Sequence, residues 1–256
     1  FLNLCSNFFD RLCCAGISLI IFLAFGARAY VYGNWHLSDS PNLVNGGKVS
    51  KFQVPVYGTE DAKDLILIKY ALEFPEVDFA KPHSIRIFDD KSLATILTFG
   101  EVVDGHSHCF KNHENICLKK SGLSLMNLWH EIDHIDAMQL PMIATTDWLV
   151  IASYGDGFKY NLGTNINDHG FPKNGLWTGY GATKFVEDMA EWRSVIYFCL
   201  YLECNPQANP FIYIEDKDDF RYALKLGWLL EWRRITPGQY VKIKKLMLSM
   251  GFKFKP

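Results

Sequence analysis

The sequence has no strong excess of either charge. Its 26 lysines and arginines nearly balance its 28 aspartates and glutamates, for a formal net charge of -2. No polybasic stretch supplies the electrostatic attraction that nucleic-acid binding requires, so we expect no nucleic-acid partner. Internal repeats and low-complexity tracts are also absent from the sequence. Nothing therefore indicates a repeat architecture or an extended tail.

The N-terminal apolar run is too short for a comfortable membrane span, which needs about 20 residues. This run, Leu12–Phe25, has 14 residues; Arg11 precedes it, and a small-x-small tripeptide ending at Ala29 follows. That order is typical of a secretory signal peptide. We predict a signal peptide over residues 1–29, truncated because Phe1 is not a methionine, and a secreted or periplasmic protein. A retained, membrane-anchored segment is the alternative.

Cysteine is sparse in the predicted mature chain. The sequence has seven cysteines, and outside the predicted signal they are Cys109, Cys117, Cys199 and Cys204. An even number is consistent with two disulfides in an oxidising compartment. Cys109 and Cys117 would close a short loop, but three pairings are possible and the sequence does not choose among them. Four reduced, buried cysteines are the alternative.

The segment His130-Glu131-Ile132-Asp133-His134 has the pattern H-E-x-x-H. Residues four apart lie on one face of a helix, so both imidazoles can reach one ion. Glu131 is rotated from His130 by about 100°, which is close enough to hold a water beside that ion and to accept its proton. The pattern predicts a zinc site of the metallopeptidase kind, although it also arises by chance in inert sequences.

The surroundings of the motif favour a helix over about residues 123–138. Leucines and isoleucines recur there at spacings of three and four, and the two histidines lie off that apolar stripe. Ser121 and Ser124 are candidate N-caps, and Pro141 follows the expected end of the helix. Two histidines and a glutamate buried for structural reasons alone would be hard to satisfy without a metal.

A catalytic zinc ion usually has three protein ligands and one position open to water. Candidates for the third ligand lie in a downstream helix that Thr183 can cap, where Glu187 and Glu191 are four residues apart and share a face. One carboxylate would bind the metal, and the other would orient a ligand by a hydrogen bond. The helix dipole alone favours acidic residues in a first turn, which explains Glu187 and Asp188 better than Glu191.

These residues resemble the gluzincin metallopeptidases, and most closely the catalytic domain of anthrax toxin lethal factor and its relatives. After the H-E-x-x-H helix come Tyr-Gly-x-Thr at 180–183 and E-D-x-A-E at 187–191, so the resemblance covers about residues 115–200. It implies that Glu187 is the third zinc ligand, that Tyr180 assists catalysis and that Glu191 has a supporting role. The chain departs from the family at Asp133, where glycine is usual, and at Met189, where phenylalanine is common.

We expect an α+β fold in which residues 30–256 form one zincin-like catalytic domain of two lobes. The N-terminal lobe, about 30–140, would hold a small mixed sheet and the motif helix, and the C-terminal lobe, about 141–256, would be mostly helical. A glycine-rich loop at 155–181 would wall the cleft and deliver Tyr180. Other expected elements are turns at 30–59, strands at 84–88, 94–103 and 115–118 (an edge strand), helices at 62–74, 218–231 and 237–250, and an ambiguous segment at 148–154.

The sequence thus predicts an exported zinc metallopeptidase that acts on a peptide or protein substrate. One Zn²⁺ would be bound by His130, His134 and Glu187, and Glu131 would be the general base. Two alternatives stay open: an inactive zincin fold that binds peptide or protein, and a membrane-anchored interaction protein in which the motif is accidental. A second histidine cluster before the motif helix could also bind metal; its members are His106, His108 and His113.

Overall fold

The structure, a computed structural model, describes residues 44–89, 105–106, 115–155, 158–161 and 171–254. All of these residues belong to one unit of the chain, Ser38–Pro256. The predicted signal segment, the strand predicted at 94–103 and part of the long loop before Tyr180 lie outside them. No helix within the described ranges is both long enough and apolar enough to cross a membrane.

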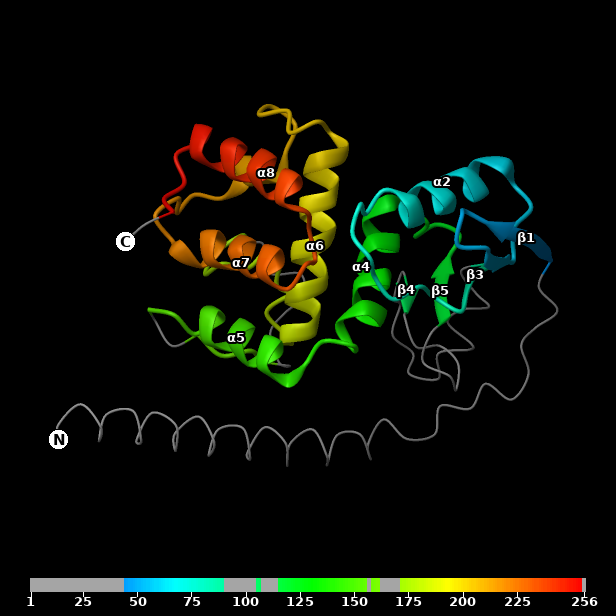
Figure 1. The fold of residues 1–256 in the computed structure, drawn as a ribbon, viewed down its shortest axis with the longest axis horizontal. Coiled ribbons are helices and arrows are strands. Elements are labelled where there is room, and N and C mark those ends of the chain that lie inside the picture. Colours follow the sequence, from blue (N-terminus) through cyan, green and yellow to red (C-terminus); the bar gives the residue numbers. More distant parts are fainter. Residues whose placement is uncertain (1–43, 90–104, 107–114, 156–157, 162–170, 255–256) are drawn as a thin grey trace. The chain divides into compact units, whose positions relative to one another are not determined.

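A five-stranded mixed sheet forms in the first part of the described chain (Figure 1). Its inner pairs, β2–β3 and β3–β5, are parallel, and its outer pairs, β1–β2 and β4–β5, are antiparallel. Parallel neighbours need a crossover connection, and helix α2 (Ala62–Glu73) provides it between β2 and β3. In sheet order the strands are β1 (Asn45–Val49), β2 (Val54–Tyr57), β3 (Ser84–Phe88), β5 (Asn115–Lys119) and β4 (Gly105–His106).

Two predictions about the sheet were wrong. The segment up to Thr59 contains β1 and β2, because two strands of only five and four residues are too short to show a clear alternation in the sequence. The strand predicted at 115–118 forms as β5, but it lies inside the sheet and not at its edge, and all five of its side chains are buried. Burial on both faces is typical of strands with parallel partners.

The motif lies on helix α4 (Leu125–Ala137), as predicted. The Ser124 side chain accepts a hydrogen bond from the Asn127 N–H at 3.2 Å and caps its start. The indole N–H of Trp129 donates to the Ala71 carbonyl of α2 at 3.1 Å, which ties the motif helix to the layer beside the sheet. The apolar stripe faces the core, with Leu128, Ile132 and Ile135 buried.

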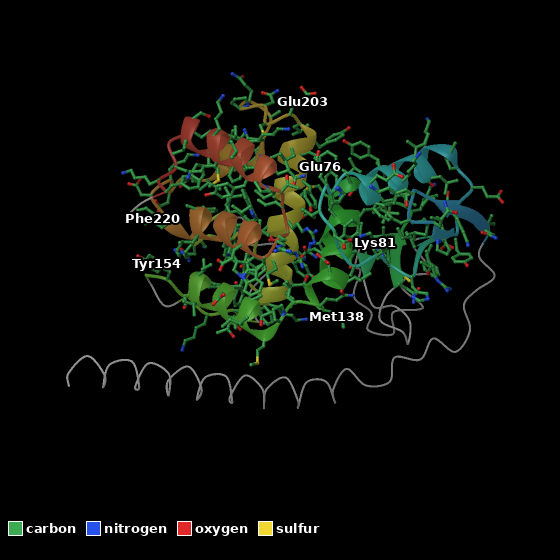
Figure 2. All side chains as sticks on the ribbon, in the orientation of Figure 1. Glu76, Lys81, Met138, Tyr154, Glu203 and Phe220 are labelled. Atoms are coloured by element: carbon green, nitrogen blue, oxygen red, sulfur yellow. The ribbon has the colours of Figure 1, made fainter. Side chains whose placement is uncertain are left out.

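The chain after α4 is mostly helical, so the predicted α+β class is confirmed. The ambiguous segment belongs to a helix whose N-cap is Pro141. Helix α6 packs against α4 (Figure 1). The side chains of Met138, after α4, and Tyr154, after α5, are 62% and 51% exposed at the surface (Figure 2). The helices are α5 (Met142–Ala152), α6 (Phe185–Tyr201), α7 (Phe220–Glu231) and α8 (Pro237–Ser249), with a short 3-10 helix at Pro210–Tyr213.

The prediction that all four cysteines form disulfides was wrong for the two near the end of α6. Cys199 and Cys204 are both free thiols. Cys199 packs in the apolar core as a small hydrophobic residue, and this burial raises the pKa of its thiol far above the ordinary value. Cys117 is disulfide-bonded. Cys109, with which it would close a short loop, lies outside the described residues.

Candidate metal centre

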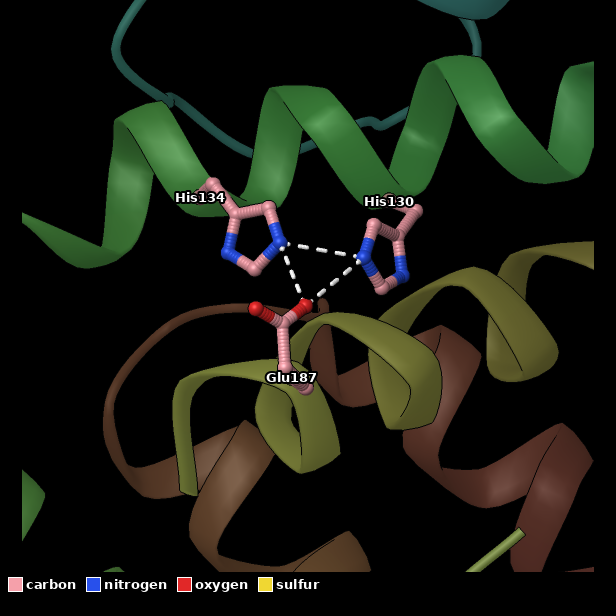
Figure 3. Close-up of side chains that lie close together, drawn as sticks. All are labelled: His130, His134 and Glu187. Atoms are coloured by element: carbon pink, nitrogen blue, oxygen red, sulfur yellow. Dashed lines mark hydrogen bonds and ion pairs between the residues drawn. The ribbon is translucent and has the colours of Figure 1, made fainter. Parts of the chain in front are cut away.

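Three side chains from two helices converge on one point (Figure 3). The Nε2 atoms of His130 and His134 are 3.0 Å apart, and Oε2 of Glu187 lies 3.3 Å from the first and 3.0 Å from the second. Around a tetrahedral zinc ion with bonds of about 2.0–2.1 Å, neighbouring ligand atoms are about 3.3 Å apart. The three atoms therefore have the spacing that one ion requires. We call His130, His134 and Glu187 the metal group.

The metal group is held by its own electrostatics when no ion is bound. Burial alone would lower the pKa of His134, but the Glu187 carboxylate outweighs it and raises that pKa to about 9. Burial alone would raise the pKa of Glu187, but His134 and His130 beside it hold that pKa well below its usual range. A proton on His134 thus satisfies the Glu187 charge, and a divalent cation would have to displace it.

Glu131 lies on α4 between the two histidines and is only 7% exposed. Its Oε2 atom has no hydrogen-bond partner in the protein. A buried polar atom without a hydrogen-bond partner lowers the free energy of unfolding by about 1–3 kcal/mol. Each such atom in a native structure therefore calls for an explanation, and a catalytic role is one of them. The charge of Glu131 acts on the centre, because it contributes to the raised pKa values of His134 and Tyr180.

Tyr180 stands in a turn directly before α6. The N–H and the hydroxyl of Thr183 both donate to the Tyr180 carbonyl, at 3.0 and 2.7 Å. Because its hydroxyl is used here, Thr183 does not cap α6 as predicted, and the N-cap is Lys184. The Tyr180 ring is centred 6.1 Å from the His130 ring. Burial and the Glu187 carboxylate raise the pKa of its phenol, which therefore stays protonated and can donate a hydrogen bond.

Glu191 lies one turn beyond Glu187 but supports the turn that carries Tyr180. Its Oε1 atom accepts a hydrogen bond from the Thr178 hydroxyl. The Thr178 oxygen in turn accepts the N–H groups of Tyr180 and Gly181, at 3.0 and 3.3 Å. Burial raises the pKa of Glu191 to about 7, so near neutral pH it is present both as the acid and as the carboxylate.

Asp188, the third carboxylate in this part of α6, is engaged elsewhere. Its Oδ2 atom accepts hydrogen bonds from the buried ammonium of Lys225 at 2.6 Å and from the Trp148 indole at 2.9 Å, and Tyr160 also donates to it. Lys225 also donates to the Gly175 carbonyl at 2.7 Å. This buried cluster ties the first turn of α6 to α5 and α7. Sequence reasoning missed Lys225, although its position three residues after Tyr222 and four before Leu229 places it on the buried face of α7.

Asp133, at which the chain departs from the gluzincin pattern, is buried against two arginines. It is 1% exposed, and its Oδ1 atom contacts Arg193 at 3.0 Å and also Arg234. Arg193 could have been found in the sequence, because it stands between Trp192 and the apolar run that begins at Val195, and a charged residue buried there must be paired. Arg234 follows α7 in a turn and carries no such signal.

The second histidine cluster lies mostly outside the described residues. His108 and His113 fall in the range 107–114, and for His106 only the backbone, in β4, is described.

Comparison of the chain with protein-family models, with curated proteins and with solved structures found no match. The arguments for a function therefore come from the chain's own side chains and their arrangement.

Proposed function

We propose that this protein is a zinc-dependent peptide hydrolase of the gluzincin type. One observation carries the proposal: His130, His134 and a glutamate 57 residues after the first histidine place three donor atoms within 3.3 Å of one another. Two imidazoles and one carboxylate are a ligand set of catalytic zinc sites, and they leave a fourth position for water or substrate. The proposal includes one zincin-like catalytic domain over residues 30–256 and export by an N-terminal signal peptide.

The chemistry follows from the side chains around the metal group. A zinc ion held there would lower the pKa of a water to about 7 and polarise a peptide carbonyl. Glu131, with its unpartnered Oε2 atom, would accept the proton of the attacking water and deliver it to the leaving amine. Tyr180, protonated and partly exposed, would donate a hydrogen bond to the carbonyl oxygen as it gains charge. Glu191 and Thr178 would hold Tyr180 in place.

Glu131→Gln tests the proposal. The substitution keeps the volume of the side chain but removes the base, so zinc content should stay at one ion per chain. Cleavage of a peptide library, followed by mass spectrometry, should fall by about 10²–10⁴-fold. Glu76→Gln changes an exposed glutamate in the same way and should leave both zinc content and cleavage unchanged. The zinc chelator o-phenanthroline should block the cleavage by the unmodified chain.

Each other outcome has a definite meaning. A wild-type rate in Glu131→Gln would remove the role given to that residue. Zinc binding without cleavage by the unmodified chain would favour the alternative of an inactive zincin fold that binds peptide. A purified chain that binds no zinc would end the proposal and leave the accidental-motif alternative.

A further inference from the structure

Four charged side chains form a closed ring beside the metal group. Asp133 and Asp136 lie three residues apart on α4, and each of two arginines contacts both of them. Arg193 reaches Asp133 at 3.0 Å and Asp136 at 2.5 Å. Arg234 reaches Asp136 at 2.9 Å and also contacts Asp133. We call Asp133, Asp136, Arg193 and Arg234 the charge ring.

The charge ring joins the two helices that carry the metal group. Its aspartates flank His134 on α4, and Arg193 lies on α6, six residues after Glu187. Arg234, in the turn between α7 and α8, closes the ring from the other side. The Tyr197 hydroxyl accepts a hydrogen bond from Arg193 Nε at 3.0 Å and donates to the Arg234 carbonyl at 2.9 Å, which fixes both arginines.

Stability alone is a poor explanation for this ring. Its side chains are between 1% and 12% exposed, so four charges have been taken out of water. Replacing buried ion pairs by apolar groups is often neutral or stabilising, because the desolvation penalty offsets the attraction. Three polar atoms of the ring also lack a hydrogen-bond partner in the protein, namely Asp133 Oδ2, Arg193 Nη2 and Arg234 Nε.

The geometry of the ring explains it better. Arg234 contacts Asp133 through Nη2 and Asp136 through Nη1, as a rigid planar fork. Arg193 contacts both carboxylates through Nη1, and its Nε is held by the Tyr197 hydroxyl. Contacts to two carboxylates one helical turn apart set both the position of an arginine along the helix and its angle. Apart from the charge ring and the metal group, α4 and α6 also meet through aromatic side chains such as Trp129 and Tyr197, whose rings are centred 5.7 Å apart. Contacts of that kind tolerate small shifts, whereas a metal site needs its ligands held within about 0.5 Å.

We propose that the charge ring positions the metal group by fixing the register of α4 against α6. This inference rests on the proposed function. The four residues of the ring are positioning residues, and they act through the helices that carry His130, His134 and Glu187. Asp133, at which the chain departs from the gluzincin pattern, is the member of the ring that both arginines contact through one oxygen, Oδ1.

Two variants separate positioning from stability. Arg193→Lys keeps the charge but removes Nε, which donates to the Tyr197 hydroxyl, and with it the rigid fork that holds Nη1 between the two carboxylates. The triple variant Asp133→Asn/Arg193→Met/Arg234→Met removes most of the ring's charge and leaves Asp136 with its hydrogen bond from the Ala80 N–H, at 2.8 Å. Ile243→Val, a substitution on the buried face of α8, is the control that lowers stability without touching the ring. The protein used is the full chain in every case.

Three measurements are needed on each variant: the zinc dissociation constant by competition with a chelator, the visible spectrum of the Co²⁺-loaded protein, and the urea midpoint of the metal-free protein. We expect both ring variants to bind zinc about 10–100-fold more weakly, as when groups that orient ligands are removed, and to show an altered Co²⁺ spectrum. Ile243→Val should bind zinc like the unmodified chain, even if its urea midpoint falls as far as the midpoints of the ring variants.

Zinc affinity within twofold of wild type and an unchanged Co²⁺ spectrum in both ring variants would overturn this inference and leave the proposed function intact. If the triple variant does not fold, Arg193→Lys decides alone. If that variant does not fold either, the ring is required for the fold itself and the positioning role is wrong. A wild-type chain that binds no zinc would overturn the proposed function, and this inference with it.

Discussion

Zinc binding should be coupled to the loss of about one proton from His134. Burial lowers the pKa of this imidazole, but the Glu187 carboxylate raises it to about 9 in the metal-free protein. A histidine that binds zinc must be neutral, so the ion has to displace that proton. Because pH 7 lies about two units below this pKa, the affinity at pH 7 should be about 100-fold below its high-pH limit. It should change about tenfold for each pH unit below 9.

Competition with a chelator of known proton affinity, from pH 6.5 to 10, measures this slope. Calorimetry in buffers of different ionisation enthalpy counts the protons released for each zinc ion. Glu187→Gln is the informative control, because it removes the charge that raises the pKa of His134. Its weaker affinity should level off at a lower pH, near the ordinary imidazole pKa of about 6.5. A wild-type affinity that is constant between pH 7 and 8 would refute the reasoning, since His134 would then hold no proton against Glu187.

Three further outcomes are expected. The metal-free protein should become less stable with rising pH, because the pKa of His134 is about 9 in the folded chain against 6.5 in the unfolded chain. This shift gives stability that is complete below pH 6.5 and lost as pH passes 9, and at about 1.4 kcal/mol per pKa unit the loss is about 3 kcal/mol. Urea unfolding at pH 6 and at pH 9.5, with a chelator present, measures the difference. Tyr180→Phe should keep its zinc and lower kcat by about 10²–10³-fold with little change in KM; an unchanged kcat would mean that Tyr180 only packs beside His130. In Gly181→Ala the new Cβ would lie 2.4 Å from Glu191 Oε2, so the carboxylate must move. We expect this variant to be about 1–3 kcal/mol less stable and to cleave peptide more weakly, with zinc retained. Gly227→Ala on α7 is the control: nothing lies within 4 Å of the added atom, so it should not destabilise the chain.

The motif helix could be predicted from the sequence because its signals are local. The spacing of His130 and His134, the apolar stripe and the Ser124 cap all act within a few residues of one another. Helix α8 was foreseen for the same reason, and in the structure Thr236 and Gln239 form a capping box at its start. Local rules were less informative for the sheet. Whether a strand lies at the edge or inside depends on which strands pair, so β5 was misplaced.

The environment of Asp133 shows the same limit. In the sequence it reads as one more acidic residue on an amphipathic helix. In the structure its partners are Arg193 and Arg234, which are 60 and 101 residues away along the chain. No periodicity within α4 carries information about partners so distant. In the sequence, Arg193 stands between Trp192 and the apolar run that begins at Val195, which indicates a charge at the edge of the core but does not indicate its partner.

The sequence by itself determined that two imidazoles lie on one helical face with a glutamate beside them, and that three carboxylates follow within five residues of a second helix. Only the tertiary structure decided which carboxylate meets the imidazoles. Successive residues of a helix point about 100° apart, so the packing of α6 against α4 and α7 sends each one to a different partner. Glu187 reaches the histidines, Asp188 reaches Lys225, and Glu191 reaches Thr178.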